Sequence, residues 1–538
     1  MLPISSLIAL LGAISLSPAV VARHILAEEN KIPTEENATM LQAFEWYIPD
    51  DHTHWKRLAR DIEKYRDIGI TALWIPPPCK ASSPSGNGYD IYDLWDLGEF
   101  DQKGSVPTKW GDKDDLVRLA HNAEKAGVLL YADAVLNHKA AADETERCRV
   151  AEVDPENRTR FISDEYEIDG WLGFTFSGRG DKYSSMKWHW EHFSGTDYNA
   201  ENNKTAIYKI LGDFKSWAQS VDNEKGNFDY LMFADIDHSH PDVKKDINDW
   251  GIWIAELLSL RGFRFDAVKH FSEEYLKEFI TQLKTNVNED FFFVGEFWKD
   301  SLSDMLGYLD RLDGHKFSLF DAPLVYNFSE ASKTESFDLR AIFDGTLVQA
   351  RPISAVTLVM NHDTQPHQAL EAPIEGFFKP IAYGLILLRQ EGYPCVFWGD
   401  LEGISGEYKE EPSCGGQLSD IILARKLYAY GEQDDYFDYP TCLGWVRRGA
   451  WDRLNGCAVI VSNAGPGEKR MFVGEEHKGE IWTDVLGWEQ GEVHIGEDGN
   501  ADFKCPATSM AIWVNKDAPG RDQFGKFKPG KGILQGVV

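Results

Sequence analysis

The chain has 538 residues, enough for two or three domains and a large hydrophobic core. Its 55 Lys and Arg against 87 Asp and Glu give a formal net charge of −32, which opposes binding to nucleic acid or to anionic membranes. Apolar residues (43%) and charged residues (26%) occur in the proportions of an ordinary globular protein.

The first 22 residues carry no charged side chain and predict a cleaved secretory signal peptide, although Lys or Arg usually precedes the apolar run. The apolar run from Leu7 to Leu16 is too short to cross a bilayer, and the small residues Ala19 and Ala22 follow it. A buried N-terminal segment is the alternative. We expect a secreted, extracellular protein without a membrane span. Four glycosylation triplets are compatible with secretion and lie at Asn37, Asn157, Asn203 and Asn327.

The cysteines show no pair with the spacing of a zinc site. In an oxidising compartment some can form disulfides, but an odd number leaves at least one cysteine unpaired within the chain. The sequence does not determine the pairing. The seven cysteines are Cys79, Cys148, Cys395, Cys414, Cys442, Cys457 and Cys505.

From Met40 onward, short apolar runs alternate with longer amphipathic segments. Residues 40–46, 71–78 and 128–135 have the character of buried strands. Apolar residues recur at helical spacing near 55–65 and 116–123, and a glycine follows each of these segments. Alternation of this kind predicts a parallel sheet with helices on both faces.

The alternation stops at residues 138–234, which are polar, aromatic and rich in glycine. A plain loop of this length is uncommon inside a compact domain. We therefore expect an inserted subdomain of irregular β structure between the third and fourth strands.

Five more strands follow the insertion, so the pattern contains eight strands that alternate with helices. This count predicts a (β/α)8 TIM barrel, with a doubly wound open sheet as the structural alternative. The five strands are expected at 262–267, 291–296, 316–320, 355–360 and 395–398.

The domain limits follow from these changes in pattern. The barrel is expected to consist of residues 23–137 and 235–431. Short strand-like runs with turn residues at 432–515 predict a C-terminal antiparallel β-sandwich domain. The Gly- and Lys-rich residues 516–538 predict a flexible tail.

Polar side chains follow several of the predicted barrel strands. The carboxyl ends of parallel barrel strands meet at one rim, where active sites form. Several carboxylates at one rim are typical of glycoside hydrolysis, which needs a carboxylic acid and a second carboxylate. Structural ion pairs or a Mg or Zn centre are the alternatives. The candidate residues are Asp133, Asn137, His138, Arg264, Asp266, Lys269, His270, Glu296, Asn361, His362 and Asp363.

Four motifs occur in order along the chain: DAVLNH (133–138), GFRFDAVKH (262–270), GEFW (295–298) and MNHDT (360–364). They resemble the ordered motifs of the α-amylase family, glycoside hydrolase family 13, and the resemblance extends from about Met40 to Asn515. LMFADIDHSHPDV and LARKLYAYGEQDDYFDYP further resemble the liquefying-type bacterial branch and its fungal relatives.

The resemblance implies a role for each catalytic residue. Asp266 is the expected nucleophile, and Glu296 the expected general acid and then base. Asp363 is expected to hold sugar hydroxyls and to stabilise the transition state. Arg264 is expected to orient Asp266 and to keep it ionised. If Phe297 and Trp298 shield Glu296, its pKa should rise, as a general acid near neutral pH requires.

The resemblance also implies substrate-binding residues. His138 and His362 are expected to form hydrogen bonds with the sugar at the cleavage position. Tyr89 is expected to stack beneath that sugar. Lys269 and His270 are expected to line the leaving-group side.

The resemblance implies one calcium site. Its ligands are expected to be Asn137, Asp229, Asp235 and the backbone carbonyl of His270, and oxygen ligands of this kind suit Ca²⁺. The ion would fix the insertion to the barrel. Solvated Asp side chains are the alternative.

The sequence departs from the bacterial relatives, which have further acidic ligands for a second calcium and a sodium. Ser194 and Ala218 align with two of those ligands. We therefore expect one calcium rather than the larger metal cluster.

Taken together, the motifs predict a secreted, monomeric, calcium-binding, retaining and endo-acting α-1,4-glucan hydrolase that acts on starch and malto-oligosaccharides. Transglycosylation, or the release of one favoured oligosaccharide, is the alternative within the family. A non-catalytic glucan-binding protein and a metal-dependent hydrolase of other substrates are the alternatives from other classes.

Overall fold

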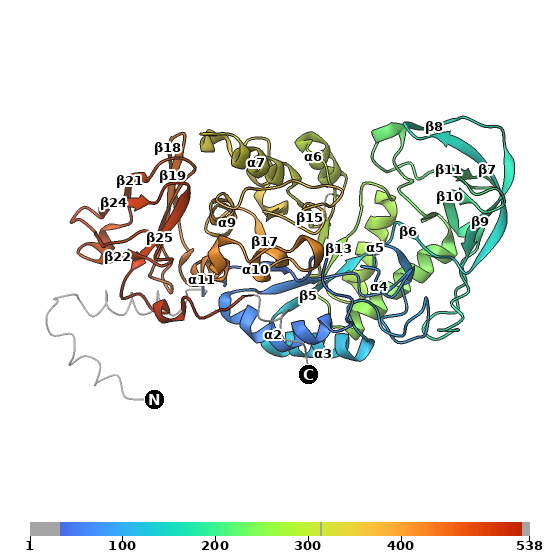
Figure 1. The fold of residues 1–538 in the computed structure, drawn as a ribbon, viewed down its shortest axis with the longest axis horizontal. Helices are drawn as coiled ribbons and strands as arrows, with labels where there is room; N and C mark the ends of the chain where they lie inside the picture. The colour runs from blue at the N-terminus through green and yellow to red at the C-terminus, as the bar shows by residue number, and fades with distance from the viewer. Residues whose placement is uncertain (1–32, 313–314, 530–538) are drawn as a thin grey trace, which may run out of the picture.

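A computed structural model describes residues 33–312 and 315–529. The predicted signal peptide, residues 1–22, lies outside the described residues. Three parts lie in a row: a C-terminal sheet domain, a central barrel and an inserted β subdomain at the far end (Figure 1). Across the described residues, no helix combines the length and the apolar character that crossing a bilayer requires.

The central part is a closed barrel of eight parallel strands. The first strand pairs with both the second and the last, so the sheet has no edge. This closure confirms the (β/α)8 prediction over the open doubly wound sheet. The strands are β1 (Met40–Gln42), β2 (Ala72–Ile75), β5 (Leu129–Ala134), β13 (Gly262–Phe265), β14 (Phe292–Gly295), β15 (Phe317–Phe320), β16 (Ala355–Leu358) and β17 (Tyr393–Phe397).

Helices cover the outside of the barrel, and the first two end at the glycines, Gly69 and Gly127, that follow the predicted helical segments. In the second of these helices, the Asp112 carboxylate accepts the N–H of Asp115, and Gly127 ends the helix with φ 70°. The longer helices are α2 (His54–Ile68), α3 (Lys113–Ala126), α4 (Pro241–Leu257), α5 (Glu273–Asn286), α6 (Leu302–Arg311), α7 (Ala322–Lys333), α9 (Lys379–Leu387) and α11 (Leu418–Tyr428). The shorter ones are α8 (Leu347–Ala350) and α10 (Trp398–Glu402).

The insertion between β5 and α4 is a seven-stranded sheet, more regular than the sequence predicts. Its first and last strands pair with each other, His138 opposite Asp235 and Lys139 opposite Ala234, and form a narrow neck. The strands are β6 (His138–Lys139), β7 (Glu144–Asp154), β8 (Asn157–Phe161), β9 (Tyr166–Gly173), β10 (Phe193–Asn199), β11 (Lys204–Ile210) and β12 (Ala234–Ile236).

A second loop, after β2, supports this neck. It contains the two short strands β3 (Lys80–Ala81) and β4 (Ile91–Asp93). The buried ammonium of Lys139 donates to the Tyr92 carbonyl at 3.0 Å and lies 4.8 Å from the ring of Trp188. One cation therefore joins the loop, the neck and the aromatic interior of the insertion.

The C-terminal domain has two antiparallel sheets that share a hydrophobic core. This arrangement confirms the predicted sandwich. One sheet contains β18 (Gln433–Tyr439), β19 (Cys442–Arg447), β20 (Cys457–Ser462), β22 (Ile481–Asp484), β23 (Val493–His494) and β25 (Ser509–Asn515). The other contains β21 (Gly467–Phe472) and β24 (Asn500–Cys505).

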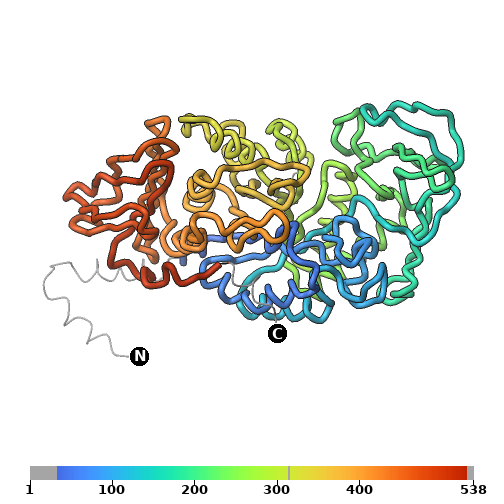
Figure 2. The backbone as a smooth tube through the Cα atoms, in the orientation of Figure 1, coloured from blue at the N-terminus to red at the C-terminus, as the bar shows by residue number. Residues whose placement is uncertain are grey.

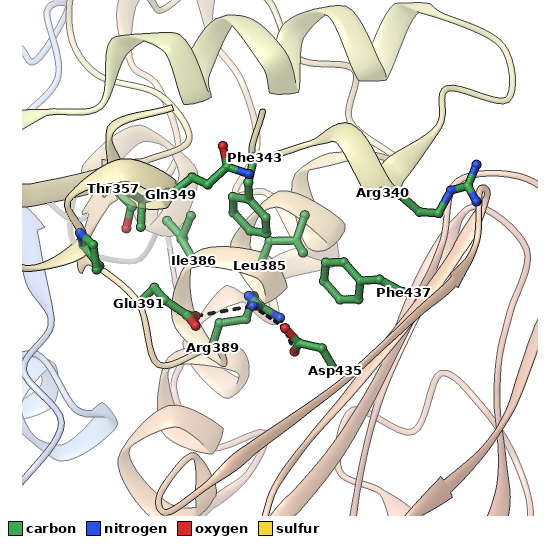
Figure 3. Close-up of a pocket in the computed structure, with 12 residues that line it drawn as sticks. Arg340, Phe343, Gln349, Thr357, Leu385, Ile386, Arg389, Glu391, Asp435 and Phe437 are labelled. Atoms are coloured by element: carbon green, nitrogen blue, oxygen red, sulfur yellow. Dashed lines mark hydrogen bonds and ion pairs between the residues drawn. The ribbon is translucent and has the colours of Figure 1, made fainter. Parts of the chain in front are cut away.

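The barrel meets this domain around a buried arginine, Arg389 (Figure 3). Its guanidinium forms two hydrogen bonds with Asp435 and an ion pair with Glu391. It also lies 5.3 Å from the ring of Phe343 and 5.0 Å from that of Phe437. These contacts surround a cavity of about 290 Å³, whose lining includes none of the predicted site residues.

The flexibility of residues 516–538 stays a prediction, but two aromatic side chains of this tail pack against barrel helices. The tail returns along α11 and α2 (Figure 2). Phe524 stacks on Tyr428 with 6.2 Å between ring centroids, and Phe527 lies 6.3 Å from Tyr65. The prediction rested on the Gly- and Lys-rich composition and did not consider these two phenylalanines, which bury apolar area against the barrel helices.

Candidate active site

Arg264 lies at the centre of the carboxylates at the barrel rim. It stands in register with Asp133 on the neighbouring strand, and its residue is 0% exposed. Its Nη1 donates to Asp133 Oδ1 at 2.8 Å and to Asp266 Oδ1 at 2.7 Å. Its Nη2 donates to Glu296 Oε2 at 2.9 Å. One guanidinium thus bridges carboxylates from three strands.

Burial raises the pKa of the carboxyls in this group above their usual values. Burial raises the pKa of Asp266 to about 6; Arg264 opposes this rise and Asp133 adds to it. Burial also raises the pKa of Glu296, against the effect of Arg264. Burial and the charge of Glu296 raise the pKa of Asp363 well above its usual range. A single cation beside several buried carboxylates can therefore leave one ionised and another protonated.

Ala267 has a backbone conformation that L-residues rarely adopt, with φ 52°. The sharp turn directs its N–H toward the general-acid candidate, and this N–H donates to Glu296 Oε2 at 3.1 Å. Backbone strain of this kind concentrates at functional sites. The turn after Asp266 therefore fixes Glu296 as well as the strand end.

Three rings form a flat wall beside the carboxylates. Tyr89 stacks on His362 with ring centroids 4.9 Å apart and an interplanar angle of 8°. Trp46 stacks on Tyr89 at 5.9 Å and 9°. The Tyr89 hydroxyl donates to Asp133 Oδ2 at 2.8 Å, which fixes the ring. An aromatic surface next to acids suits a sugar ring, which has an apolar face and a hydroxylated edge.

His362 is held as a neutral donor. Its Nδ1 accepts a hydrogen bond from Gln42 Nε2 at 3.1 Å, so the proton is on Nε2, which lies 3.2 Å from Asp363 Oδ2. Burial lowers the pKa of His362 well below its usual value. His138 is also buried, and its Nε2 donates to the Tyr89 carbonyl at 2.8 Å. His362 is therefore one of the three stacked rings, and His138 is hydrogen-bonded to the backbone of another, Tyr89.

Lys269 and His270 lie where the rim meets the insertion. The Lys269 ammonium is 3.4 Å from Glu224 Oε2, and the Asp222 N–H donates to the Lys269 carbonyl at 2.9 Å. His270 Nδ1 donates to the Phe228 carbonyl at 2.9 Å. Both residues are therefore held by the last turns of the insertion.

Asn137 and Asp235 lie side by side at the neck, and Asp229 interacts electrostatically with Asp235. The Ile236 N–H donates to the Asn137 carbonyl at 3.0 Å, which brings Asn137 beside Asp235. Burial raises the pKa of Asp229 to about 7 and that of Asp235 well above its usual range, and Asp229 adds to the second effect. Within residues 33–312 and 315–529, no Lys or Arg forms an ion pair with either carboxylate.

One buried atom supports a metal at this neck. Asn137 Oδ1 has no hydrogen-bond partner among the described residues, and the residue is 1% exposed. A buried oxygen without a donor is costly. Two carboxylates without a cation and an unpartnered amide oxygen fit a hard divalent ion such as Ca²⁺.

The two positions that depart from the bacterial relatives are filled by protein hydrogen bonds. The Ser194 hydroxyl donates to Asp235, and the Ala218 N–H donates to Asp229 Oδ2 at 2.8 Å. A third carboxylate nearby, Asp237, has its own cation: Lys215 Nζ lies 2.7 Å from Asp237 Oδ2, and the Lys215 side chain is 6% exposed. Part of the acidic cluster is therefore neutralised by the chain itself.

A second group of possible ligands consists of His192, His240 and Asp242. Backbone N–H groups donate to Nδ1 of both histidines, from His189 at 2.8 Å and from Asp242 at 3.3 Å. The neutral rings then carry their protons on Nε2, where a transition metal would have to bind. A metal-binding histidine normally donates from its second nitrogen. The group therefore fits a transition metal poorly.

Residues that the sequence did not assign to the site also shape it. Asp133 begins the DAVLNH motif and was placed at the rim, but it received no role. Trp74 Nε1 donates to Asp133 Oδ2 at 3.0 Å, and Gln42 fixes the His362 tautomer. The motif could have identified Asp133. No local pattern identifies Trp74 or Gln42, because their partners, Asp133 and His362, lie far from them in the sequence.

Comparison with known proteins places these features among related chains. The family model for the alpha amylase catalytic domain matches residues 48–424. A glucan 1,4-alpha-maltohexaosidase of Bacillus sp. (strain 707) is 45% identical over 485 residues, 89% of this chain and 93% of that protein. An alpha-amylase of Bacillus licheniformis is 44% identical and covers 89% and 94%. A cytoplasmic alpha-amylase of Escherichia coli (strain K12) is 42% identical and covers 89% and 99%.

Solved structures show the same fold at low sequence identity. An alpha-amylase from Geobacillus thermoleovorans complexed with acarbose matches with a TM-score of 0.59 and 16% identity. That match covers 89% of this chain and 98% of the other. An alpha-amylase from Malbranchea cinnamomea matches with a TM-score of 0.55 and 15% identity, over 90% and 96% of the two chains.

Proposed function

The chain belongs to the alpha-amylase family, glycoside hydrolase family 13, and on that premise we propose that it cleaves internal α-1,4 bonds of starch and malto-oligosaccharides with retention of anomeric configuration. It is a glycoside hydrolase with α-amylase activity. The observation that carries the proposed mechanism is the bridge of Arg264, which holds Asp266 and Glu296 on the two nitrogens of one guanidinium.

In the first step, Asp266 attacks the anomeric carbon while Glu296 transfers its proton to the glycosidic oxygen. The bond between that carbon and oxygen breaks, and the leaving chain departs as an alcohol. The remaining sugar is joined to Asp266 as an ester. Burial raises the pKa of both carboxyls and Arg264 opposes both rises, so the mechanism requires that Asp266 is the one that loses its proton and Glu296 the one that keeps it.

In the second step, Glu296 acts as a base and takes a proton from water. The water oxygen attacks the anomeric carbon, the ester bond breaks, and Asp266 leaves as a carboxylate. Glu296 is then protonated for the next cycle, and two inversions give net retention. Asp363, which His362 contacts, is placed to accept hydrogen bonds from sugar hydroxyls.

Hydrolysis of soluble starch by the wild-type protein and by Asp266→Asn tests this mechanism. We expect a rapid fall in viscosity, α-anomeric new ends by NMR, and a loss of at least about 10⁴-fold in the variant. Asp290→Asn is a matched control, because Asp290 is exposed at the opposite end of β14. New β-anomeric ends would contradict retention, and reducing ends without an early fall in viscosity would contradict internal cleavage.

The calcium site is proposed at the neck of the insertion. Asn137, Asp229 and Asp235 would hold the ion, with the backbone carbonyl of His270. When bound, the ion supplies the positive charge that the two carboxylates lack and ties the neck to the catalytic rim. Lys215 already neutralises Asp237, which supports one ion rather than a larger cluster.

Release of one favoured malto-oligosaccharide is a second candidate function. A cavity of about 360 Å³ lies at the neck of the insertion, and Trp171, Asp197 and Phe233 are among the residues that line it. The Phe233 ring lies 5.4 Å from His138, and Trp171 is 45% exposed. A relative with the name glucan 1,4-alpha-maltohexaosidase is 45% identical. Trp171→Ala should broaden the product lengths and leave cleavage of a short chromogenic substrate unchanged.

Secretion is proposed on the basis of residues 1–22, and one relative is named a cytoplasmic alpha-amylase. Expression of the full chain in a secreting host, followed by N-terminal sequencing of the protein in the medium, tests secretion and cleavage.

Asn157 and Asn203 are exposed, whereas the amide nitrogens of Asn37 and Asn327 each donate to two backbone carbonyls. We expect glycans only at the exposed pair, as glycopeptide mass spectrometry can show.

A further inference from the structure

Two buried thiols face each other in the core of the C-terminal domain. Cys442 is on β19 in one sheet, and Cys505 is on β24 in the other, opposite Gly467 of β21. A Cβ atom added to Gly467 would lie 2.7 Å from the Cys442 sulfur and 2.8 Å from the Cys505 sulfur. Both sulfurs therefore border one small gap, which exists because residue 467 has no side chain.

Cys442 can be reached from solvent, whereas Cys505 is fully buried. Cys442 is 6% exposed and lines a cavity of about 750 Å³ on the surface of the domain, while Cys505 is 0% exposed. Ser462, Gly467 and Lys469 line the same cavity. A small reagent in this cavity would meet Cys442 first, with Cys505 behind it.

A lysine beside the cavity distinguishes the two thiols. Lys469, whose side chain is 5% exposed, forms an ion pair with Asp438. Burial raises the pKa of the Cys442 thiol, and the Lys469 ammonium opposes that rise. Burial raises the pKa of Cys505 to about 12, with a further contribution from Cys442. A nearby ammonium favours the thiolate, which is the nucleophile in thiol–disulfide exchange.

We propose that Cys442 and Cys505 form a reactive thiol pair, which a small-molecule disulfide such as oxidised glutathione converts to an intrachain disulfide between β19 and β24. The Cys442 thiolate attacks one sulfur of the reagent, forms a mixed disulfide and releases one reduced thiol. Cys505 then attacks the Cys442 sulfur and releases the second thiol. The reagent is reduced to two thiols, and the two cysteines are oxidised together.

The two sulfurs border the same gap from facing sheets. The proposed bond requires a change of side-chain rotamer that brings them to bonding distance. The bond would close the chain from residue 442 to residue 505. Closing a long loop stabilises a domain chiefly by restricting its unfolded state.

The experiment treats the folded full-length protein with oxidised glutathione and analyses non-reduced peptides by mass spectrometry. In the wild type we expect the loss of two hydrogens and one cross-linked peptide pair that contains residues 442 and 505. In Cys505→Ser we expect one stable glutathionyl group on Cys442. In Cys442→Ser we expect neither the 442–505 cross-link nor a glutathionyl group on Cys505, because the thiol that meets the reagent first in this cavity is gone.

Cys457→Ser is the matched control. Cys457 is in the same domain and 0% exposed, but it belongs to the core that faces the barrel. This variant should form the 442–505 bond at the wild-type rate, and the oxidised protein should unfold several degrees higher than the reduced one. A wild type that keeps both thiols free, or one that cross-links another pair, would overturn the proposal. Starch hydrolysis by each variant shows that it is folded.

Discussion

The chain contains two clusters of buried carboxylates, which differ in whether a side chain of the protein compensates their negative charge. At the barrel rim, Arg264 bridges Asp133, Asp266 and Glu296. At the neck of the insertion, Asp229 and Asp235 have no ion-pair partner among the described residues. Uncompensated buried charge is expensive, so the second cluster depends on protons or on an ion from solution.

The cluster at the rim contains the proposed catalytic residues, whereas the cluster at the neck joins the insertion to the barrel. The arginine is part of the chain, so the cation at the rim does not depend on the supply of metal ions in solution. If the neck binds the proposed ion, its stability should change with the supply of cations, without chemical change at the rim. The comparison predicts that the two clusters respond to different perturbations.

Removing the built-in cation should have the largest effect. Arg264→Met leaves three buried carboxylates uncompensated, so we expect a loss of about 3–5 kcal/mol in the free energy of unfolding. Activity should fall by about 10³-fold or more, because the nucleophile loses its counter-ion. Denaturant unfolding and kcat/KM measure the two effects. Arg264→Lys keeps the charge but lacks the two nitrogens that reach separate carboxylates. Its stability and its activity should therefore lie between those of the wild type and of Arg264→Met.

Removing the dissociable cation should have the next largest effect. A chelator should lower the unfolding midpoint, and calcium at about 1,000 times its Kd should restore about 4 kcal/mol. Asp235→Asn should abolish this response to calcium while the rim stays intact. Calorimetry with and without calcium makes the comparison. An equal calcium response in Asp235→Asn would show that the ion binds elsewhere.

Lys215 sharpens the contrast, because it is a built-in cation inside the second cluster. Lys215→Met leaves Asp237 buried without its partner and should cost about 1–3 kcal/mol. Calcium should not recover this loss, whereas Lys215→Arg should largely avoid it. A deficit that disappears in calcium would mean that an ion can replace the ammonium.

The smallest expected effect is a shift in pH dependence. The nucleophile must be ionised, and its pKa is raised to about 6, so kcat/KM should fall as the pH drops below about 6. Asp133 contributes to that rise. Asp133→Asn should therefore move the acid limb to lower pH, by about half a unit to one unit. An acid limb that stays in place or moves upward would remove this role from Asp133.

Much of the fold could be predicted because the barrel strands are buried on both faces. Their apolar runs and the helix signals between them are local features, as at Asp112 and Gly127. The insertion was harder, because its strands mix polar and aromatic residues and pair across long distances. The packing of Phe524 and Phe527 depends on side chains of α2 and α11 that adjoin them only in the folded chain.

The site shows the same division. Asp266, Glu296 and Asp363 could be named because each follows its own strand within a recognisable motif. The hydrogen bonds from Trp74 to Asp133 and from Gln42 to His362 join segments that are far apart in the sequence and meet only in the closed barrel. The positive φ of Ala267 has no compositional signal, because alanine is not a residue that favours it. The motifs therefore predict which residues are catalytic, whereas the residues that hold them in place become visible only in the folded structure.

The pairing of β6 with β12 makes the insertion a loop that is closed at its base. Its entry and exit points are neighbours, so the barrel can accommodate the whole insertion as if it were a short turn. Such an arrangement tolerates exchange: an unrelated unit with adjacent ends could be grafted at residues 139 and 234 without stretching the barrel. The proposed ion lies at this base, so hydrogen exchange after its removal should quicken across the entire insertion before it quickens in the barrel.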